Sequence, residues 1–561
     1  MNYLKKVNSL YLLLSLLIVG LSCTSSQAQV ILRDTTVTWQ HHSYALNPDY
    51  SMDTWTTDNT DIEEVSFSGA KVIENDLIRL VIVPEYGARV LSHYYKPTQH
   101  EYLYQSECGS PYGMNAGNFY YDWLMVWGGI FPTFPEPEHG KTWLVPWDYS
   151  VVKNTTDTVT IQMQYTDERS FDGAPGGFNN GTTNVTCVVE VSVYSHSAVW
   201  DFDVKLINNE AESVNYEYWT CTTLTPGSEE GKTASPLNSE MIIPSEEYFA
   251  AWSPGAWIGN YNSYYAMRDI AYLDDWVDMG IAYAADFKAN YWGVINHENE
   301  EGIMRISDNQ ETPGVKLWTW GRNNVDNNMF DFNNGGADNY IELWAGASES
   351  FFTDATLTAN QEKSWKESYC ATVGMTGVDA MDTHAALHLL WDEEAQGLGY
   401  ELNTFQPDAV YTLVLSLDDP SGFKVEEDVV FEALGQGADY DLATEDIAAG
   451  YYVASLELHN QEDEVVLATS REIYVGTVLQ VDRPAVGLDQ MAIHTMGNLQ
   501  IIAHMPQSGQ YSYQVYNLNG QTVQQAHVVD SQIDIHLAEA GIYLLRIADG
   551  HSVVTRKIAV R

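Results

Sequence analysis

The stretch VIENDLIRLVIVPEYGARVLSHYYKPTQHEYLY, residues 72–104, decides the fold that we expect for the largest part of the chain. It contains a run of strand-forming residues, a Pro-Glu-Tyr-Gly turn at residues 84–87, and a second such run that ends in aromatic residues. Apolar and β-branched runs on either side of a proline–glycine turn are typical of two paired strands. The stretch therefore predicts a β-hairpin at the start of a large sheet.

Strict alternation of apolar and polar residues extends this prediction along the chain. In VTIQMQY, residues 159–165, every second side chain is large and apolar, and VWDFDVKLI, residues 199–207, repeats the pattern. A period of two indicates antiparallel sheets with one buried and one wet face. The best short helix candidate is RDIAYLDDWVDMG, residues 268–280. We therefore predict an all-β protein.

Composition and spacing divide the chain into blocks. We predict a signal peptide, an N-terminal extension, a large sandwich rich in Trp and Tyr, an immunoglobulin-like sandwich, a linker, and a small C-terminal β-sandwich. Their boundaries are 1–28, 29–63, 64–375, 376–476, 477–488 and 489–561. No second long apolar run follows the signal peptide, so no membrane-spanning segment is expected.

Charge and cysteine content limit the partners. The formal net charge is -51, from 77 acidic and 26 basic residues, so nucleic acid is an improbable partner. After the signal peptide four cysteines remain, at positions 108, 187, 221 and 370, without a CxxC pair. They allow two disulfides or buried thiols, and a zinc cluster is not expected.

The C-terminal block resembles a known sorting domain. The marks are YQVYNLNGQTVQQ at 513–525, AGIYLLRI at 540–547 and TRKIAV at 555–560. They are similar to the C-terminal sorting domain of the type IX secretion system of Bacteroidetes. This resemblance implies that the protein is secreted or attached to the cell surface, with the type IX machinery as a partner.

The large block resembles the galactose-mutarotase-like β-sandwich family, in an uncharacterised bacterial branch. Besides residues 72–104, the matching motifs in order are GGIFPTFPEPEHG at 128–140, NYEYWTCTTLTPG at 215–227, PGVKLWTWGR at 313–322 and the segment 339–367. The resemblance implies a two-sheet supersandwich that presents a concave face to sugar. Mutarotases, glycoside hydrolases and polysaccharide lyases share this scaffold, so it does not fix the reaction.

The same resemblance points to Glu342 as the catalytic acid/base. IELWAG precedes LTANQEKSW at the spacing at which mutarotases carry a strand glutamate before a turn. Neighbouring tryptophans would desolvate this carboxylate and raise its pKa toward neutrality. The mutarotase histidines have no direct counterpart: Tyr218 (or Tyr216) stands near one of them, and His139 lies in the region of the other.

The proline-stiffened loop FPEPEHG, residues 134–140, supplies the other candidate catalytic groups. Glu136 and Glu138 could oppose a second carboxylate across a glycosidic bond, which hydrolysis needs. Alternatively His139 and a tyrosine could assist elimination from a uronate, with Arg89, Arg322, Lys141 or a cation neutralising its carboxylate. A solvated acidic loop is the ordinary alternative for the two glutamates.

Aromatic and basic residues near the motif turns are the candidate substrate-binding residues. Tryptophan offers a flat apolar face to a pyranose ring, and the residues selected are Trp127, Trp143, Trp320, Arg322 and Arg89. The Asp- and Asn-rich segment 325–340 is a candidate for calcium. No cofactor is expected to be required, and no metal ligand is assigned.

Together these features predict a secreted carbohydrate-active enzyme that cleaves a poly- or oligosaccharide by general acid/base chemistry. Glycoside hydrolysis is the first expectation. The alternatives are a polysaccharide lyase acting on a uronate-containing glycan, an aldose epimerase, and a non-catalytic glycan-binding protein.

Overall fold

A computed structural model describes most of the 561-residue chain. The described residues are 29–46, 52–56, 58–109, 127–136, 140–142, 145–168, 170, 182–252, 263–267, 270–326, 338–392, 396–406, 410–418, 423–430, 442–443, 450–475, 491–496, 499–517, 521–548 and 553–560. The predicted signal peptide, His139, Trp143 and most of the calcium candidate (327–337) lie outside these residues. The chain forms two compact units, divided between Val475 and Gly476.

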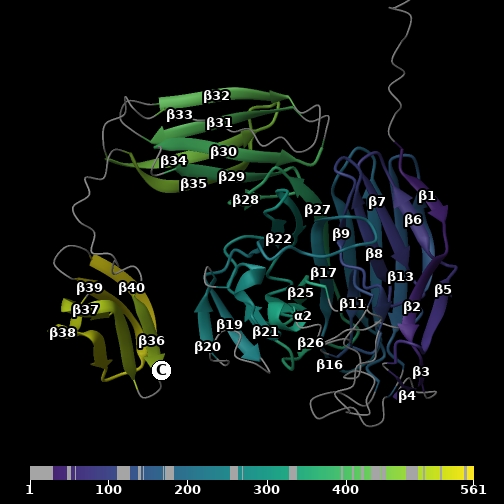
Figure 1. Ribbon diagram of the computed structural model, residues 1–561, viewed down its shortest axis with the longest axis horizontal. Helices are drawn as coiled ribbons and strands as arrows, with labels where there is room; N and C mark the ends of the chain where they lie inside the picture. Colours follow the sequence, from purple (N-terminus) through teal and green to yellow (C-terminus); the bar gives the residue numbers. More distant parts are fainter. Residues whose placement is uncertain are drawn as a thin grey trace, which may run out of the picture. The chain divides into compact units, whose positions relative to one another are not determined.

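A twelve-stranded sheet forms one layer of the first unit (Figure 1). Its strands in spatial order are β1 (Ile31–Asp34), β6 (Lys71–Glu74), β7 (Ile78–Val83), β8 (Arg89–Tyr95), β11 (Ile130–Thr133), β17 (Trp219–Ser228), β25 (Ile341–Gly346), β24 (Gly314–Thr319), β21 (Gly280–Ala284), β19 (Glu247–Trp252) and β20 (Ser263–Ala266), with β9 (His100–Leu103) paired to β8 and β17. The hairpin predicted from residues 72–104 is present as the antiparallel pair β7–β8.

An eight-stranded antiparallel sheet forms the second layer. Its strands in order are β12 (Asp148–Asn154), β13 (Thr158–Thr166), β14 (Val185–Tyr194), β15 (Trp200–Asn208), β27 (Glu362–Val373), β23 (Glu301–Ile306), β22 (Tyr291–Asn296) and β18 (Ser239–Ile242). Residues of both sheets build one continuous hydrophobic core, which includes Leu80 and Leu343 from the first sheet and Phe202 and Val204 from the second. The alternation in VWDFDVKLI therefore orients β15 as predicted.

Short elements surround this sandwich. They are β2 (Val37–His42), β5 (Ile62–Phe67) and β10 (Cys108–Gly109) in a three-stranded sheet, the pairs β3 (Tyr44–Leu46) with β4 (Met52–Trp55) and β16 (Val214–Tyr216) with β26 (Ala355–Leu357), the 3-10 turn η2 (Leu273–Asp275) and the helix α2 (Arg322–Asp326). The helix predicted over 268–280 is therefore limited, in its described part, to a single 3-10 turn. The backbone of this segment bonds to another part of the chain instead: Met241 N donates to Ala271 O at 2.7 Å, and Asp274 N donates to Leu237 O at 2.9 Å.

A buried ion pair lies between the two sheets. Glu367 accepts hydrogen bonds from Arg305 Nε at 2.9 Å, Thr220 Oγ1 at 2.8 Å, Trp365 Nε1 at 2.9 Å and Tyr369 OH at 2.8 Å. Neither Glu367 nor Arg305 is accessible to solvent. These donors lower the pKa of Glu367 against the opposing effect of burial, so the pair is ionised in the core.

A second sandwich follows within the first unit. One sheet contains β28 (Ala380–Met381), β29 (Ala385–Asp392), β30 (Gly397–Thr404) and β33 (Leu442–Ala443), and the other contains β32 (Phe423–Val430), β31 (Val410–Asp418), β34 (Gly450–His459) and β35 (Val465–Val475). The two sheets enclose their own hydrophobic core. Backbone N–H groups of the first sandwich also bond to the second: Val373 N donates to Asn403 Oδ1 at 2.7 Å, and Ala198 N to Phe405 O at 3.0 Å.

The second unit is a five-stranded antiparallel sheet with a separate core. Its strands are β36 (Ala492–Met496), β37 (Gln500–Asn517), β38 (Thr522–His536), β39 (Gly541–Ala548) and β40 (Val553–Val560). The all-β class is thus confirmed. In the described part of the chain, no helix has the length and apolar character needed to cross a membrane.

All four described cysteines are buried free thiols rather than disulfides. Burial raises the pKa of each thiol, which makes them weak nucleophiles. The sequence left open whether these cysteines form two disulfides or remain buried thiols, and in the structure they are buried thiols.

Candidate active site

The twelve-stranded sheet has one face toward the core and one face away from it, and the second carries the candidate site. In β25, Ile341, Leu343 and Ala345 belong to the core. Because successive side chains in a strand point to opposite faces, Glu342 and Trp344 lie on the outer side. We call this side the Glu342 face; it also carries Lys316 and Trp318 of β24, and Trp219, Cys221 and Thr223 of β17.

The carboxylate of Glu342 is held by three hydrogen bonds. Its Oε2 accepts from Lys316 Nζ at 2.9 Å and from Trp344 Nε1 at 2.8 Å, and its Oε1 accepts from Tyr340 OH at 3.1 Å. The residue is 6% exposed. A carboxylate has about four acceptor positions, so after these described partners Oε1 can accept one further donor, such as a substrate hydroxyl or a water.

The Lys316 ammonium lies among aromatic rings as well as against Glu342. It is 3.9 Å from the centroid of the Trp344 ring and 5.7 Å from that of Phe351. Such cation–π contacts fix the ammonium where it is desolvated. The ion pair with Lys316 holds the carboxylate of Glu342 in one orientation.

A second carboxyl group lies near one end of this face. Asp338 is four positions before Glu342 in the chain, so their Cα atoms are at most about 14 Å apart. Burial, and then the charge of Glu107, raises the pKa of Asp338 to about 6. Asp338 acts electrostatically on Tyr104, whose ring stacks on Tyr340 with centroids 4.1 Å apart. Asp338 is therefore connected to Glu342 through the Tyr104–Tyr340 pair.

Another acidic pair, Glu217 and Glu136, occupies the far end of the same face. Glu217 N donates to Pro135 O at 2.7 Å, and Trp219 Nε1 donates to Glu217 Oε2 at 3.2 Å. Thr223 is the cross-strand partner of Glu342 and lies six residues after Glu217. At about 3.3 Å per residue the two regions are about 20 Å apart along β17. Glu136 therefore does not flank the same bond as Glu342.

The raised pKa of Glu217 makes the stability of the folded protein depend on pH. Burial, and then the charges of Asp354 and Glu136, raise the pKa of Glu217 to about 8, against the hydrogen bond from Trp219. Between about pH 4.5 and 8 the unfolded state releases this proton while the folded state keeps it. The contribution of Glu217 to folding stability is therefore fully present below about pH 4.5 and is lost as the pH rises toward 8.

We predict that Glu217→Gln raises the free energy of unfolding at pH 8 by a few kcal/mol relative to the unsubstituted chain, and leaves it nearly unchanged at pH 4. Urea unfolding of both proteins at the two pH values measures the difference. An effect of equal size at both pH values would mean that folding does not raise the pKa of Glu217.

Tyr218 is not part of the Glu342 face. Its side chain is inaccessible in the core between the sheets, where its OH lies 3.1 Å from Thr220 Oγ1 and its ring packs edge-on against Trp365. Strand alternation sends Tyr218 inward because Glu217 and Trp219 point outward. The sequence argument that placed Tyr218 near a mutarotase histidine does not bring it to the site.

The tryptophans selected as sugar platforms are packed rather than open. Trp127 is 4% exposed and stacks on Trp39, with Phe67 against it as well. Trp320 is inaccessible and lies edge-on to Trp318. Among the described residues, the half-buried aromatic side chains on the Glu342 face include Trp318 and Tyr283.

The selected arginines and Lys141 already have protein partners. Arg89 is wholly buried, donates to the carbonyls of Tyr86 and Gly128, and lies over the Phe131 ring at 3.7 Å. Burial lowers its pKa to about 10. Arg322, in α2, pairs with Asp274, and Lys141 pairs with Asp167. A direct substrate-binding role for Arg89 would require the loss of these packing contacts.

The backbone conformation and close packing before β11 require glycine at positions 128 and 129. Gly128 and Gly129 have φ values of 86° and 90°, a region that favours glycine. A Cβ on Gly129 would lie 2.4 Å from Val90 O. The close approach of this turn to β8 lets Gly129 N donate to Thr223 Oγ1 at 2.6 Å, beside the Glu342 face.

In the described residues, no three His, Cys, Asp or Glu side chains gather in a way that could hold a metal. Calcium binding by segment 325–340 remains a prediction, because 327–337 lie outside the described part.

Sequence reasoning did not select Lys316, Tyr340, Trp344 and Asp338. Lys316 had a signal: in PGVKLWTW it is a lysine in the alternate position of an otherwise apolar strand. A lysine is rarely buried without a partner. The pairing with Glu342 required the strand order β24–β25, which the sequence does not contain.

Comparison with known protein families finds two matches in the chain. Residues 495–561 match a family described as "Secretion system C-terminal sorting domain", and residues 273–370 match a "Domain of unknown function (DUF5107)", a segment that includes Lys316, Asp338 and Glu342.

Similar solved structures include a TPR-domain containing protein from Parabacteroides distasonis, at 15% identity and a TM-score of 0.48, with 66% of this chain and 60% of that chain covered. The chain thus spans 60% of the length of that protein. A putative aldose 1-epimerase from Escherichia coli K12 matches at 10% identity and a TM-score of 0.35, covering 53% of this chain and 96% of that one. A galactose mutarotase-like protein from Clostridium acetobutylicum matches at 11% identity and a TM-score of 0.37, covering 55% and 96%.

The C-terminal block is a sorting domain of the type IX secretion system, and the protein is accordingly secreted or carried on the cell surface.

Proposed function

We propose that the protein is a secreted carbohydrate-active enzyme that hydrolyses glycosidic bonds at the Glu342 face. The observation that carries this proposal is the carboxylate of Glu342, oriented by Lys316, Trp344 and Tyr340 on an aromatic surface away from the core. A buried carboxylate that three donors orient, with one acceptor position left over after its partners in the described residues, suits a general base.

In this mechanism Glu342 and Asp338 divide the two proton transfers. Asp338, with a pKa of about 6, is the acid that protonates the leaving glycosidic oxygen. Glu342, oriented by Lys316, takes a proton from the water that attacks the anomeric carbon. Inverting hydrolases hold their carboxyl groups about 6.5–9.5 Å apart, and the Cα atoms of Asp338 and Glu342 are at most about 14 Å apart, which is compatible with that separation.

The charge of the chain favours an uncharged glycan. A formal charge of -51 repels polyanions. The cations needed to neutralise a uronate are engaged: Lys316 with Glu342, Arg322 with Asp274, and Lys141 with Asp167. Elimination is therefore disfavoured. The half-buried rings of Trp318 and Tyr283 offer apolar surface to a sugar ring.

The test is product analysis with a panel of neutral and uronate-containing polysaccharides. We expect new reducing ends from a neutral glycan, at a rate that falls as the pH rises through about 6, where Asp338 loses its proton. Asp338→Asn is expected to lower that rate by roughly 10²–10⁴-fold. An unsaturated chromophore would indicate elimination, anomer interconversion alone would indicate an epimerase, and binding without products would indicate a lectin-like role.

A further inference from the structure

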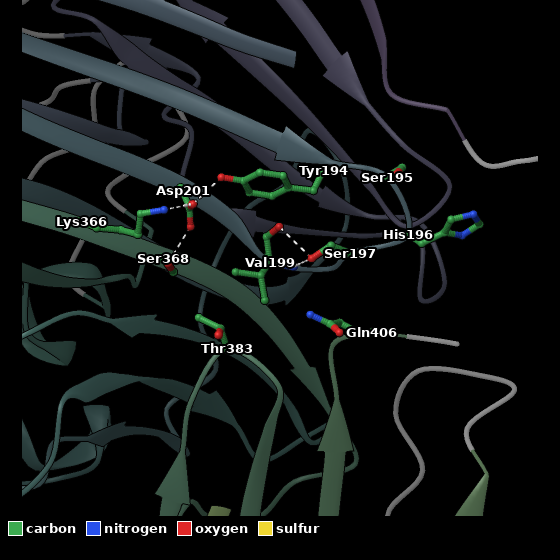
Figure 2. Close-up of a pocket in the computed structure, with 10 residues that line it drawn as sticks. All are labelled: Tyr194, Ser195, His196, Ser197, Val199, Asp201, Lys366, Ser368, Thr383 and Gln406. Atoms are coloured by element: carbon green, nitrogen blue, oxygen red, sulfur yellow. Dashed lines mark hydrogen bonds and ion pairs between the residues drawn. The ribbon is translucent and has the colours of Figure 1, made fainter. Parts of the chain in front are cut away.

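A polar cavity lies on the other side of the first sandwich from the Glu342 face. Its volume is about 740 Å³, within the range of ligand-binding pockets. It is bounded by the outer surface of β14, β15 and β27 and by the turns of the second sandwich that hold Thr383 and Gln406 (Figure 2). The lining residues are Tyr194, Ser195, His196, Ser197, Val199, Asp201, Lys366, Ser368, Thr383 and Gln406.

Asp201 organises the donors and acceptors of this cavity. Its Oδ2 accepts from Tyr194 OH at 2.6 Å and Lys366 Nζ at 2.5 Å, and its Oδ1 accepts from Ser368 Oγ at 2.7 Å. Figure 2 shows these bonds converging on Asp201. Because Tyr194 and Ser368 each donate their hydroxyl proton to Asp201, their oxygens face a ligand as acceptors.

Lys366 contributes hydrogen-bond donors to the cavity. It is half exposed, and after its bond to Asp201 an ammonium has further N–H donors to offer. Its charge is offset by Asp201 and, at 3.9 Å, by Asp203. The amide of Gln406 can both donate and accept. The cavity therefore presents mixed donors and acceptors without an excess of positive charge.

We propose that this cavity is a second saccharide-binding site, for an uncharged polyhydroxylated ligand. A sugar hydroxyl is both a donor and an acceptor, so it can satisfy Tyr194 and Ser368 as well as Lys366. A carboxylate has no proton for the two hydroxyl oxygens, and both a carboxylate and a phosphate meet the negative charge of Asp201. An ammonium ligand would meet Lys366. The position, away from Glu342, suits the retention of a long glycan chain rather than its chemistry.

The experiment measures binding by the full-length protein, with neutral glucan, xylan and mannan oligosaccharides, a uronate oligosaccharide and inorganic phosphate as probes. Saturation-transfer NMR and calorimetry are expected to detect a neutral oligosaccharide. Gln406→Ala, which alters an exposed side chain, and Lys366→Met are each expected to weaken its binding at least tenfold. The matched control is Lys205→Met. Lys205 is an ion-paired lysine of β15 that does not line the cavity.

Turnover of a short soluble substrate is expected to be unchanged in these variants, because the cavity and Glu342 lie on opposite sides of the core. Binding that persists in both cavity variants, or that is lost equally in Lys205→Met, overturns the proposal. Preferential binding of the uronate or of phosphate also overturns it. Since the measurement is of binding, it separates this proposal from a failure of the proposed hydrolysis.

Discussion

Replacing Glu342 by glutamine is expected to lower kcat/KM on the neutral glycan by roughly 10²–10⁴-fold, the usual contribution of a positioned general base. Glutamine keeps the volume and can still accept from Tyr340, but its amide cannot take a proton from water. The KM is expected to change little, because the rings of Trp318 and Tyr283 are untouched. Initial-rate kinetics measure both constants.

Stability must be measured alongside, because Glu342→Gln also leaves the Lys316 ammonium without its ionic partner. Glu401→Gln is a suitable control. Glu401 is a similarly buried carboxylate in the second sandwich, bonded to His388 Nδ1 at 2.9 Å and to Thr376. Its substitution is expected to cost stability without lowering kcat. If Glu342→Gln retains most of its activity while folded, Glu342 is not the base.

Glu367→Ala is expected to give the largest loss of stability, about 3–5 kcal/mol, because it leaves the Arg305 charge buried and unpaired. Thr220, Trp365 and Tyr369 also lose their acceptor. Urea unfolding, followed by tryptophan fluorescence, measures the change in the free energy of unfolding.

The double variant Glu367→Leu with Arg305→Met tests the cause. Replacing both charges with apolar side chains of similar size removes the unpaired group, and most of the lost stability should return. If the double variant is as unstable as Glu367→Ala, the loss comes from packing or from the other hydrogen bonds rather than from the Arg305 charge.

Local pattern predicted much of the fold. Alternation in 199–207 identified which side chains of β15 are buried, because a strand turns every second residue to the same face. The turn at residues 84–87 predicted the β7–β8 hairpin for the same local reason. The sorting domain was also identified from the sequence of its turns and strands.

The sequence selected one residue of the candidate site, Glu342, and did not select the residues that surround it. Glu342 was identified from its motif, but its partner Lys316 is 26 residues away in the chain. Only the pairing of β24 with β25 brings the two together.

Tyr218 and Glu136 show that a sequence motif can also select residues that the fold does not bring to Glu342. Both lie in motifs that suggested catalysis. Tyr218, just before β17, points into the core, and Glu136 lies beside Glu217, six residues along the chain from the cross-strand partner of Glu342.

The sequence by itself determined the all-β class, the acidic surface and the export domain, because each depends on composition or on contacts between neighbours in the chain. Only the tertiary structure decided which charges are paired, which rings are open and which carboxyl groups share a face. Those properties depend on strand order and register, which join residues that are far apart in sequence.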